Sequence, residues 1–232
     1  MARCVFFLSF LVPALLSVSL HGAQGVVYDV RNDAAGTRGG AVFANTIGVD
    51  YARQSMAASA DFIWKLFQQT SDADRKPVQR VSLVVDPAMD GVAATSSDVI
   101  KFAATYLAGF SGDVKKAFTG ILYHEMTHVW QWDGRAAGAA APGWLIEGVA
   151  DFVRLKSGFP ADGWRRAGEG TSWTDSYDVT ARFFDYCEGL RGGFVAGLNK
   201  KIKGGYDERY FAELTGKTLP QLWADYKRAY GH

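Results

Sequence analysis

The chain has 232 residues, which is enough for one domain with a well-buried hydrophobic core. Its 25 basic and 24 acidic side chains nearly cancel, which argues against nucleic acid or an anionic membrane as the main partner. After the first twenty residues, no stretch is long and apolar enough to suggest a membrane-spanning helix.

The N-terminus has the order of regions that is typical of a secretory signal peptide. Arg3 is the only charged residue in the first twenty, the apolar run Val5–Leu16 follows it, and small residues lead to Gly25. The alternative is a buried N-terminal helix. We expect residues 1–25 to be a signal peptide and residues 26–232 to be a secreted domain.

The cysteine content is low for a secreted protein. Cys4 lies in the expected signal peptide, so Cys187 would remain without an internal disulfide partner. Its apolar helical surroundings predict a buried, inert thiol. We therefore expect a hydrophobic core, or a metal, to stabilise the fold.

The N-terminal half is predicted to contain most of the strands. Hydrophobic periodicity and turn residues predict strands Val26–Val30 and Gly40–Ala44 around the turn-rich Asn32–Gly39, a helix Thr46–Gln69, a strand Val78–Val85, a loop Asp86–Ser97 and a strand Val99–Leu107.

The C-terminal half is predicted to be helical. The patterns indicate a helix from about Gly112 to Trp132, a small-residue linker Ala136–Gly143, a helix Trp144–Lys156, a loop Ser157–Thr171, a helix from Asp175 or Ser176 to about Leu190, and a last helix Leu219–Tyr230 with a capping box from Thr218 to Gln221. Strands first and helices last predict an α+β domain, with a small mixed sheet over the helix that ends near Trp132.

That helix carries the strongest chemical signal, the sequence His124-Glu125-Met126-Thr127-His128. Two histidines four residues apart project from one face of a helix and can bind one Zn²⁺, while the glutamate between them can reach a bound water. The alternative is a surface helix with two solvated histidines. We interpret His124 and His128 as metal ligands and Glu125 as the general base.

A catalytic zinc site needs a third protein ligand. A histidine-based continuation of the motif fails because Gln131 and Gly134 stand where glycine and histidine would be required. Glu147, on the following helix, is the best candidate for the ligand. Asp151, one turn later, could accept a hydrogen bond from a ligating histidine without binding the metal itself. The alternative for both acids is a solvated helix face.

Peptide hydrolysis also requires a donor for the developing oxyanion. We choose Tyr177 first and Arg182 second, although Tyr177 could equally be a packing residue with an exposed hydroxyl. We further expect Val99–Leu107 to form the sheet edge beside the cleft, where a substrate could add as an extended strand.

At these residues the chain resembles the plant basic secretory protein family, also called plant basic secretory peptidases. The resemblance spans about Val26–Tyr230 and rests on Val84–Asp86 with Met89–Ala93, on Ala108–Gly112, on Tyr123–Trp132 (YHEMTHVWQW), on Trp144–Leu155 (WLIEGVADFVRL) and on Tyr177–Cys187 (YDVTARFFDYC). It implies a secreted, single-domain, zincin-like protein of the gluzincin type that is associated with plant defence. It also implies His124, His128 and Glu147 as ligands of Zn²⁺.

The sequence thus favours a secreted, monomeric zinc peptidase that acts on extracellular proteins or peptides, with no nucleic acid or membrane partner after signal removal. One rival is a non-catalytic, defence-related binding module on the same scaffold, against which the presence of Glu125 argues. Another is a structural zinc, which would need a fourth ligand that the nearby sequence does not offer.

Overall fold

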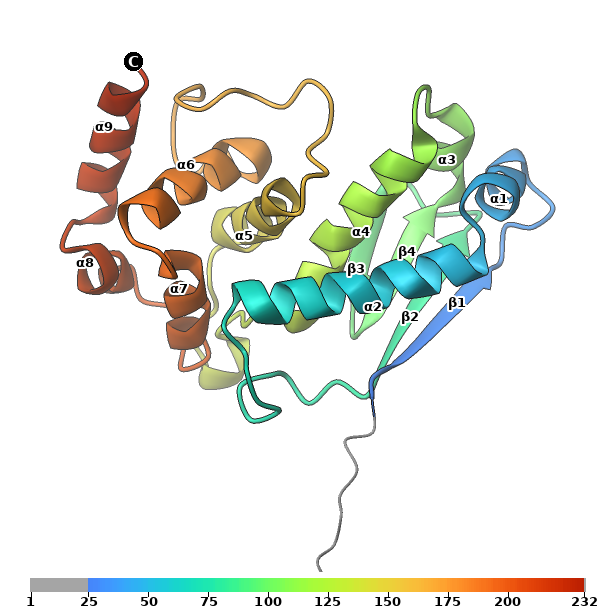
Figure 1. Cartoon of the computed structure of the whole chain (residues 1–232), viewed down its shortest axis with the longest axis horizontal. Helices are drawn as coiled ribbons and strands as arrows, with labels where there is room; N and C mark the ends of the chain where they lie inside the picture. The colour runs from blue at the N-terminus through green and yellow to red at the C-terminus, as the bar shows by residue number, and fades with distance from the viewer. Residues whose placement is uncertain (1–24, 232) are drawn as a thin grey trace, which may run out of the picture.

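The computed structural model describes residues 25–231, so the expected signal peptide lies outside the described residues except for Gly25. A four-stranded sheet and its helices form one half of the molecule, and a group of helices forms the other (Figure 1). The α+β class predicted from the sequence is confirmed. Helix α4, which carries the two motif histidines, lies where the halves meet.

The sheet is mixed, with strand order β1-β2-β4-β3. Its strands are β1 (Val27–Asn32), β2 (Arg80–Asp86), β3 (Ala93–Ser96) and β4 (Val99–Ala103). β1, β2 and β4 are parallel, whereas β3 pairs antiparallel with β4. The valine-rich β2 lies between β1 and β4 and is largely buried.

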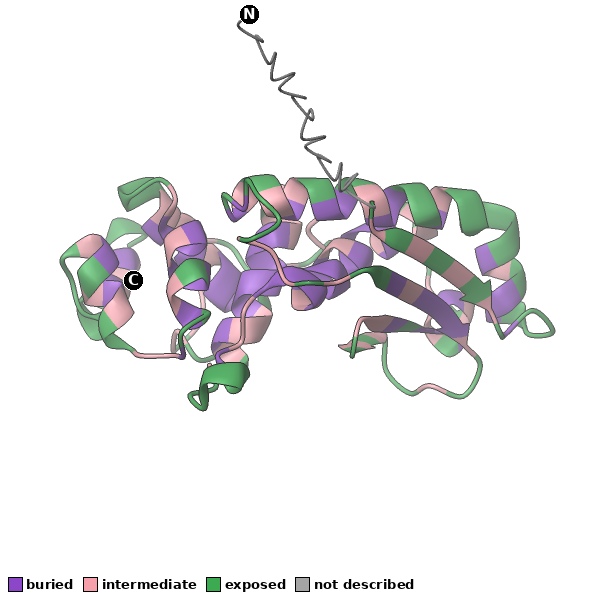
Figure 2. Ribbon diagram, turned by 90° about the horizontal axis from the view of Figure 1, so that it is seen from below, coloured by how far each residue is buried: buried purple, intermediate pink, exposed green. Residues whose placement is uncertain are grey.

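The helices of the first half cover this sheet. They are α1 (Arg38–Val42), a π-helix (Phe43–Ile47), α2 (Val49–Leu66), α3 (Ala104–Gly109) and α4 (Val114–Trp130). α2 packs against β1 and α4, and α4 also packs against β3. Buried residues gather between these layers and exposed residues line the outside (Figure 2). Eleven of the 17 residues of α4 are buried, so its polar side chains need partners.

The second half consists of a 3-10 turn (Arg135–Ala137), α5 (Gly143–Lys156), α6 (Tyr177–Leu190), α7 (Phe194–Ile202), α8 (Arg209–Thr215) and α9 (Leu219–Ala229). α5 packs between α4 and α6. Gly148 allows the close approach of α6, because a Cβ there would lie 2.3 Å from Cγ2 of Thr180. The capping box predicted at Thr218 is confirmed at the start of α9.

The strand predicted at Gly40–Ala44 is wrong, because these residues belong to α1 and the π-helix. The two glycines in α1 explain why the segment packs as a helix. A Cβ at Gly39 would lie 1.8 Å from the carbonyl oxygen of Ala104, and one at Gly40 would lie 1.9 Å from that of Ala34. Only glycine lets the backbones approach so closely.

The loop predicted at Asp86–Ser97 is also wrong in part, because it contains β3. Ser97 and Asp98 both have positive φ and join β3 to β4 as a tight two-residue turn. β4 ends at Ala103, four residues before the predicted end, because the register with β2 stops at Asp86. The edge strand is therefore β3, and the prediction that Val99–Leu107 forms the edge was wrong.

Cys187 is buried in α6 as a free thiol, as predicted. Burial raises the pKa of this thiol far above its usual value, which disfavours the reactive thiolate. Within residues 25–231, no helix is both long and apolar enough to cross a membrane.

Candidate metal centre and cleft

Three predicted ligands converge where α4 faces α5. His124 and His128 lie one turn apart on α4, and Glu147 lies on α5. Nε2 of His124 is 3.0 Å from Nε2 of His128 and 3.1 Å from Oε2 of Glu147, and the remaining pair, Nε2 of His128 and Oε2 of Glu147, is 3.6 Å apart. All the ligand atoms lie within 4.8 Å of one another, which is close enough to hold one ion.

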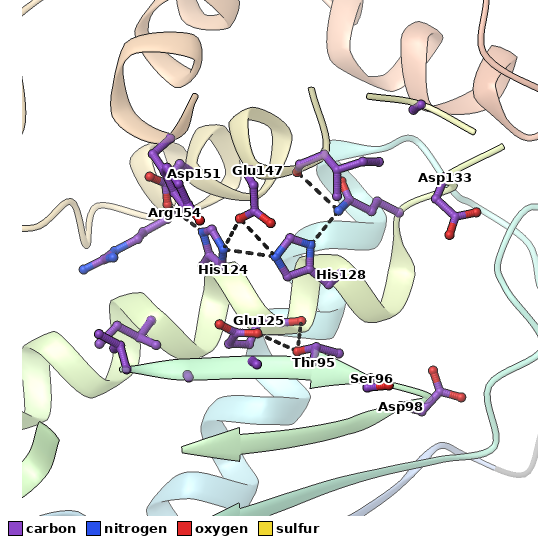
Figure 3. Close-up of a pocket in the computed structure, with 18 of the residues that line it drawn as sticks. Thr95, Ser96, Asp98, His124, Glu125, His128, Asp133, Glu147, Asp151 and Arg154 are labelled. Carbon is purple, nitrogen blue, oxygen red and sulfur yellow. Dashed lines mark hydrogen bonds and ion pairs between the residues drawn. The ribbon is translucent and has the colours of Figure 1, made fainter. Parts of the chain in front are cut away.

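Both histidine rings are held through Nδ1, the nitrogen that faces away from this meeting point. Nδ1 of His124 donates to Oδ1 of Asp151 at 2.6 Å, and Asp151 is only 3% exposed. Nδ1 of His128 lies 2.7 Å from Nε2 of Gln131, whose amide also donates to the carbonyl oxygen of Ile146. These contacts direct both Nε2 atoms toward Glu147 (Figure 3).

The charges of this cluster are coupled. Burial alone would lower the pKa of His124, but hydrogen bonds to Asp151 and Glu147 outweigh it and raise the pKa to about 9. Burial would raise the pKa of Glu147, whereas hydrogen bonds from His124 and His128 hold it well below the usual range. The two pKa shifts share a cause, because a protonated His124 and an ionised Glu147 stabilise each other.

Glu125 lies beside the two histidines and points toward the sheet edge. It is 5% exposed, and Oγ1 of Thr95 on β3 donates to its carboxylate at 2.7 Å. The same hydroxyl lies 3.1 Å from the backbone oxygen of Glu125. Thr95 therefore orients the carboxylate and attaches β3 to α4.

The cluster opens into a cleft of about 1000 Å³. Glu125, His124, His128, Glu147 and residues 92–98 all line it. Figure 3 shows Arg154 at one end, beyond His124, and Asp98 and Asp133 at the other, beyond His128, with β3 along one side. The cleft is therefore bounded by the sheet edge and by α5, with the proposed ligands between them.

The two candidates for the oxyanion donor differ in position. Tyr177 lines the cleft, is 53% exposed, and stacks its ring at 6.2 Å from that of His124. Arg182 does not line this cleft, and its Nε instead donates to the backbone oxygen of Arg165. The geometry therefore keeps Tyr177 as a candidate and removes Arg182.

Comparison with known proteins identifies the relationship of the whole domain. Residues 23–226 match a family described as a peptidase of plants and bacteria, abbreviated BSP. The chain belongs to this family. The match covers the sheet, the cleft and the helical half, and the resemblance stated from the sequence motifs is confirmed.

A shorter match relates this BSP-family chain to a protein described as a basic secretory protease from Boswellia serrata. The two are 44% identical over 59 residues, which cover 25% of this chain and 67% of that protein. The family name and this relative both support a peptidase role.

The structure adds three cleft residues that the sequence analysis did not single out as site residues, namely Thr95, Gln131 and Arg154. Thr95 lay in a predicted loop, and its partnership with Glu125 is a tertiary contact across 30 residues. Gln131 is the residue directly after α4, three residues beyond His128, and this short spacing was a usable signal.

Proposed function

We propose that this BSP-family protein is a secreted zinc-dependent peptidase, with His124, His128 and Glu147 as metal ligands and Glu125 as general base. The supporting observation is the convergence of three ligand atoms within 4.8 Å beside a buried glutamate in an open cleft. A structural metal site would be closed by a fourth protein ligand, and within residues 25–231 the cluster of possible ligands contains only these three.

The residues fit a zinc ion. Bonds of about 2.0–2.1 Å at tetrahedral angles separate ligand atoms by about 3.3 Å, and the three separations here are 3.0, 3.1 and 3.6 Å. The hydrogen bond to Asp151 places the proton of His124 on Nδ1 and leaves the lone pair of Nε2 for the metal. Coordination of His128 through Nε2 places its proton on Nδ1, so we expect the amide of Gln131 to turn its oxygen there and give up its hydrogen bond to Ile146.

Each side chain then has a defined task in peptide hydrolysis. A zinc ion held by His124, His128 and Glu147 would lower the pKa of a bound water toward about 7 and polarise a substrate carbonyl. Glu125, oriented by Thr95, accepts the proton of the attacking water and delivers it to the leaving amine. Asp151 fixes the ring of His124 and is not itself a ligand.

Tyr177 is proposed to donate a hydrogen bond to the oxyanion. Its backbone and that of Ser176 have positive φ, at 47° and 68°, an uncommon conformation for non-glycine residues that clusters at functional sites. Burial and the nearby carboxylates of Glu147, Asp151 and Glu125 raise the pKa of its hydroxyl, so it stays protonated and can donate.

The substrate is proposed to be an extended peptide that pairs with the free edge of β3, which is terminal in the sheet and lines the cleft. The name of the Boswellia serrata relative and the N-terminal pattern support secretion, to the apoplast if this is a plant protein. Action as a monomer in plant defence is part of the same proposal.

The test compares Glu125→Gln with Glu147→Gln for bound zinc and for hydrolysis of a peptide library followed by mass spectrometry. Glu125→Gln should keep its zinc and lose activity by about a hundred- to ten-thousandfold. Glu147→Gln should lose metal affinity together with activity, because a charged ligand becomes neutral.

Two results would contradict the proposal. If Glu125→Gln cleaves as fast as the wild type, Glu125 is not the base. If the wild type holds zinc but hydrolyses no peptide or protein in the library, the non-catalytic binding module is favoured instead.

A further inference from the structure

Arg154 presents a positive charge to the cleft that no acid neutralises directly. Arg154 is partly buried, and this burial lowers the pKa of its guanidinium despite the charge of Asp151. Within residues 25–231, no carboxylate oxygen lies within 4 Å of its nitrogens, and the nearby Asp151 is engaged by His124 at 2.6 Å. An arginine in such a position favours an anionic partner, because a buried charge is costly unless it is paired.

The arginine is also held in place. Its Nε donates to the backbone oxygen of Phe159 at 3.0 Å, and its guanidinium carbon lies 5.2 Å from the ring centroid of Trp164. Gly120 on α4 leaves the space for this arrangement, because a Cβ there would lie 2.8 Å from Nε and 2.4 Å from the Phe159 oxygen. Within the described residues, Nε makes the only hydrogen bond of this guanidinium, so the two terminal nitrogens remain available.

The distance from Glu147 to Arg154 is one that an extended peptide bound in the cleft could span. Arg154 follows Glu147 by seven residues on α5, which is about 10 Å along a helix, or about three residues of an extended peptide. β3 runs toward the Asp98 end of the cleft, away from the Arg154 end (Figure 3). A peptide antiparallel to β3 therefore places its C-terminal part near Arg154, where either an acidic side chain or the terminal carboxylate could bind.

The opposite end of the cleft is different in charge. Asp98 and Asp133 lie there, and Nε of Arg135 is 3.6 Å from Oδ2 of Asp133. Lys76 also lines this end, where Asp98 and Asp133 act on it, so the two cations Arg135 and Lys76 face two acids there. The unpaired positive charge at the Arg154 end makes the cleft electrostatically asymmetric.

We propose that Arg154, with Trp164 beside it, forms a subsite that binds a carboxylate group of the peptide substrate. A guanidinium can bind a carboxylate through two parallel hydrogen bonds, and its terminal nitrogens are available for them. This inference rests on the proposed peptidase function, since it assigns specificity to the same cleft.

The test measures binding without turnover. The zinc-loaded Glu125→Gln variant is titrated with fluorescein-labelled octapeptides of alanine and leucine. In one comparison, a single position of the peptide holds either Glu or the matched Gln. In the other, the C-terminus of the peptide is either a free acid or an amide. We expect Glu to bind about tenfold to a hundredfold more tightly than Gln at one position, or the acid more tightly than the amide. The arm that shows the preference distinguishes an acidic side chain from a terminal carboxylate.

Adding Arg154→Gln should abolish this preference, and Arg154→Lys should keep part of it. The matched control, Arg135→Gln, removes a positive charge from the opposite end and should keep all of it. Zinc content and the melting temperature of each variant verify that site and fold are intact. Equal binding of every matched pair, or a preference that survives Arg154→Gln, would overturn the carboxylate subsite. Absence of cleavage by the wild type would count against the proposed function instead.

Discussion

Asp151 offers a test of how the metal centre is built. Its carboxylate hydrogen-bonds to His124, a proposed ligand, and to no other residue of the proposed site. It accepts a 2.6 Å hydrogen bond from Nδ1 of His124, and both side chains are buried. Asp151→Asn keeps the shape but removes the charge, and Asp151→Ala removes the partner altogether. Loss of such a partner weakens metal binding by about ten- to a hundredfold, or about 1.4 to 2.7 kcal/mol.

Asp151 also affects the pKa of His124, and the direction of this effect determines the pH values at which zinc affinity should be measured. With Asp151 present, the pKa of His124 is about 9 in the metal-free protein, so below that pH a proton competes with zinc for the site. Removing the carboxylate lowers this pKa and weakens the competition, which partly offsets the loss of orientation near neutral pH. We therefore expect the defect of Asp151→Asn to be larger at pH 9.5 than at pH 7.

Zinc affinity would be measured at both pH values by competition with a chromophoric chelator, with circular dichroism to verify the fold. Asp133→Asn is the matched control, because Asp133 lines the same cleft but contacts neither histidine ring. Unchanged affinity in both Asp151 variants at both pH values would refute the reasoning. Complete loss of zinc from a folded protein would make Asp151 a direct ligand.

Three further outcomes are expected. Thr95→Val removes the hydroxyl that orients Glu125 at 2.7 Å and should reduce peptidase activity by about tenfold while zinc content stays the same; unchanged activity would argue against this role. Cys187 should not react with a thiol reagent at pH 8 until the protein is unfolded in urea, because burial raises the pKa of its thiol, and rapid reaction of the native protein would contradict its burial. Gly148→Ala places a carbon 2.3 Å from a side-chain carbon of α6 and should destabilise the fold by about 1–3 kcal/mol in a thermal melt. Gly189→Ala, with open space around it, is the control and should not destabilise.

Local periodicity explains why part of the site could be predicted from the sequence. His124 and His128 share a helix face because four residues make about one turn, so the spacing alone brings them together. Glu147 required one further inference, namely that the Pro142-Gly143 break starts a helix that packs against the first. The structure places these three side chains together, and their roles as ligands remain a proposal.

The parts that the sequence did not predict depend on tertiary contacts. β3 is a short run of small residues, and its turn at Ser97-Asp98 lacks the glycine that usually signals a hairpin. The path of α1 depends on backbone packing against Ala104, about 65 residues away along the chain. α7 and α8 were not predicted, although Phe194, Leu198 and Ile202 recur at helical spacing in α7 and were a usable signal.

The small size of β3 also affects how the protein behaves at high concentration. An unpaired strand edge can recruit the edge of another copy, and proteins limit this by keeping edge strands short. β3 has four residues, with side chains no larger than threonine, and one of its hydroxyls is already bonded to Glu125. Such an edge provides few backbone hydrogen bonds and little apolar area for self-association. The fold can thus keep a strand edge open in solution with little tendency to polymerise.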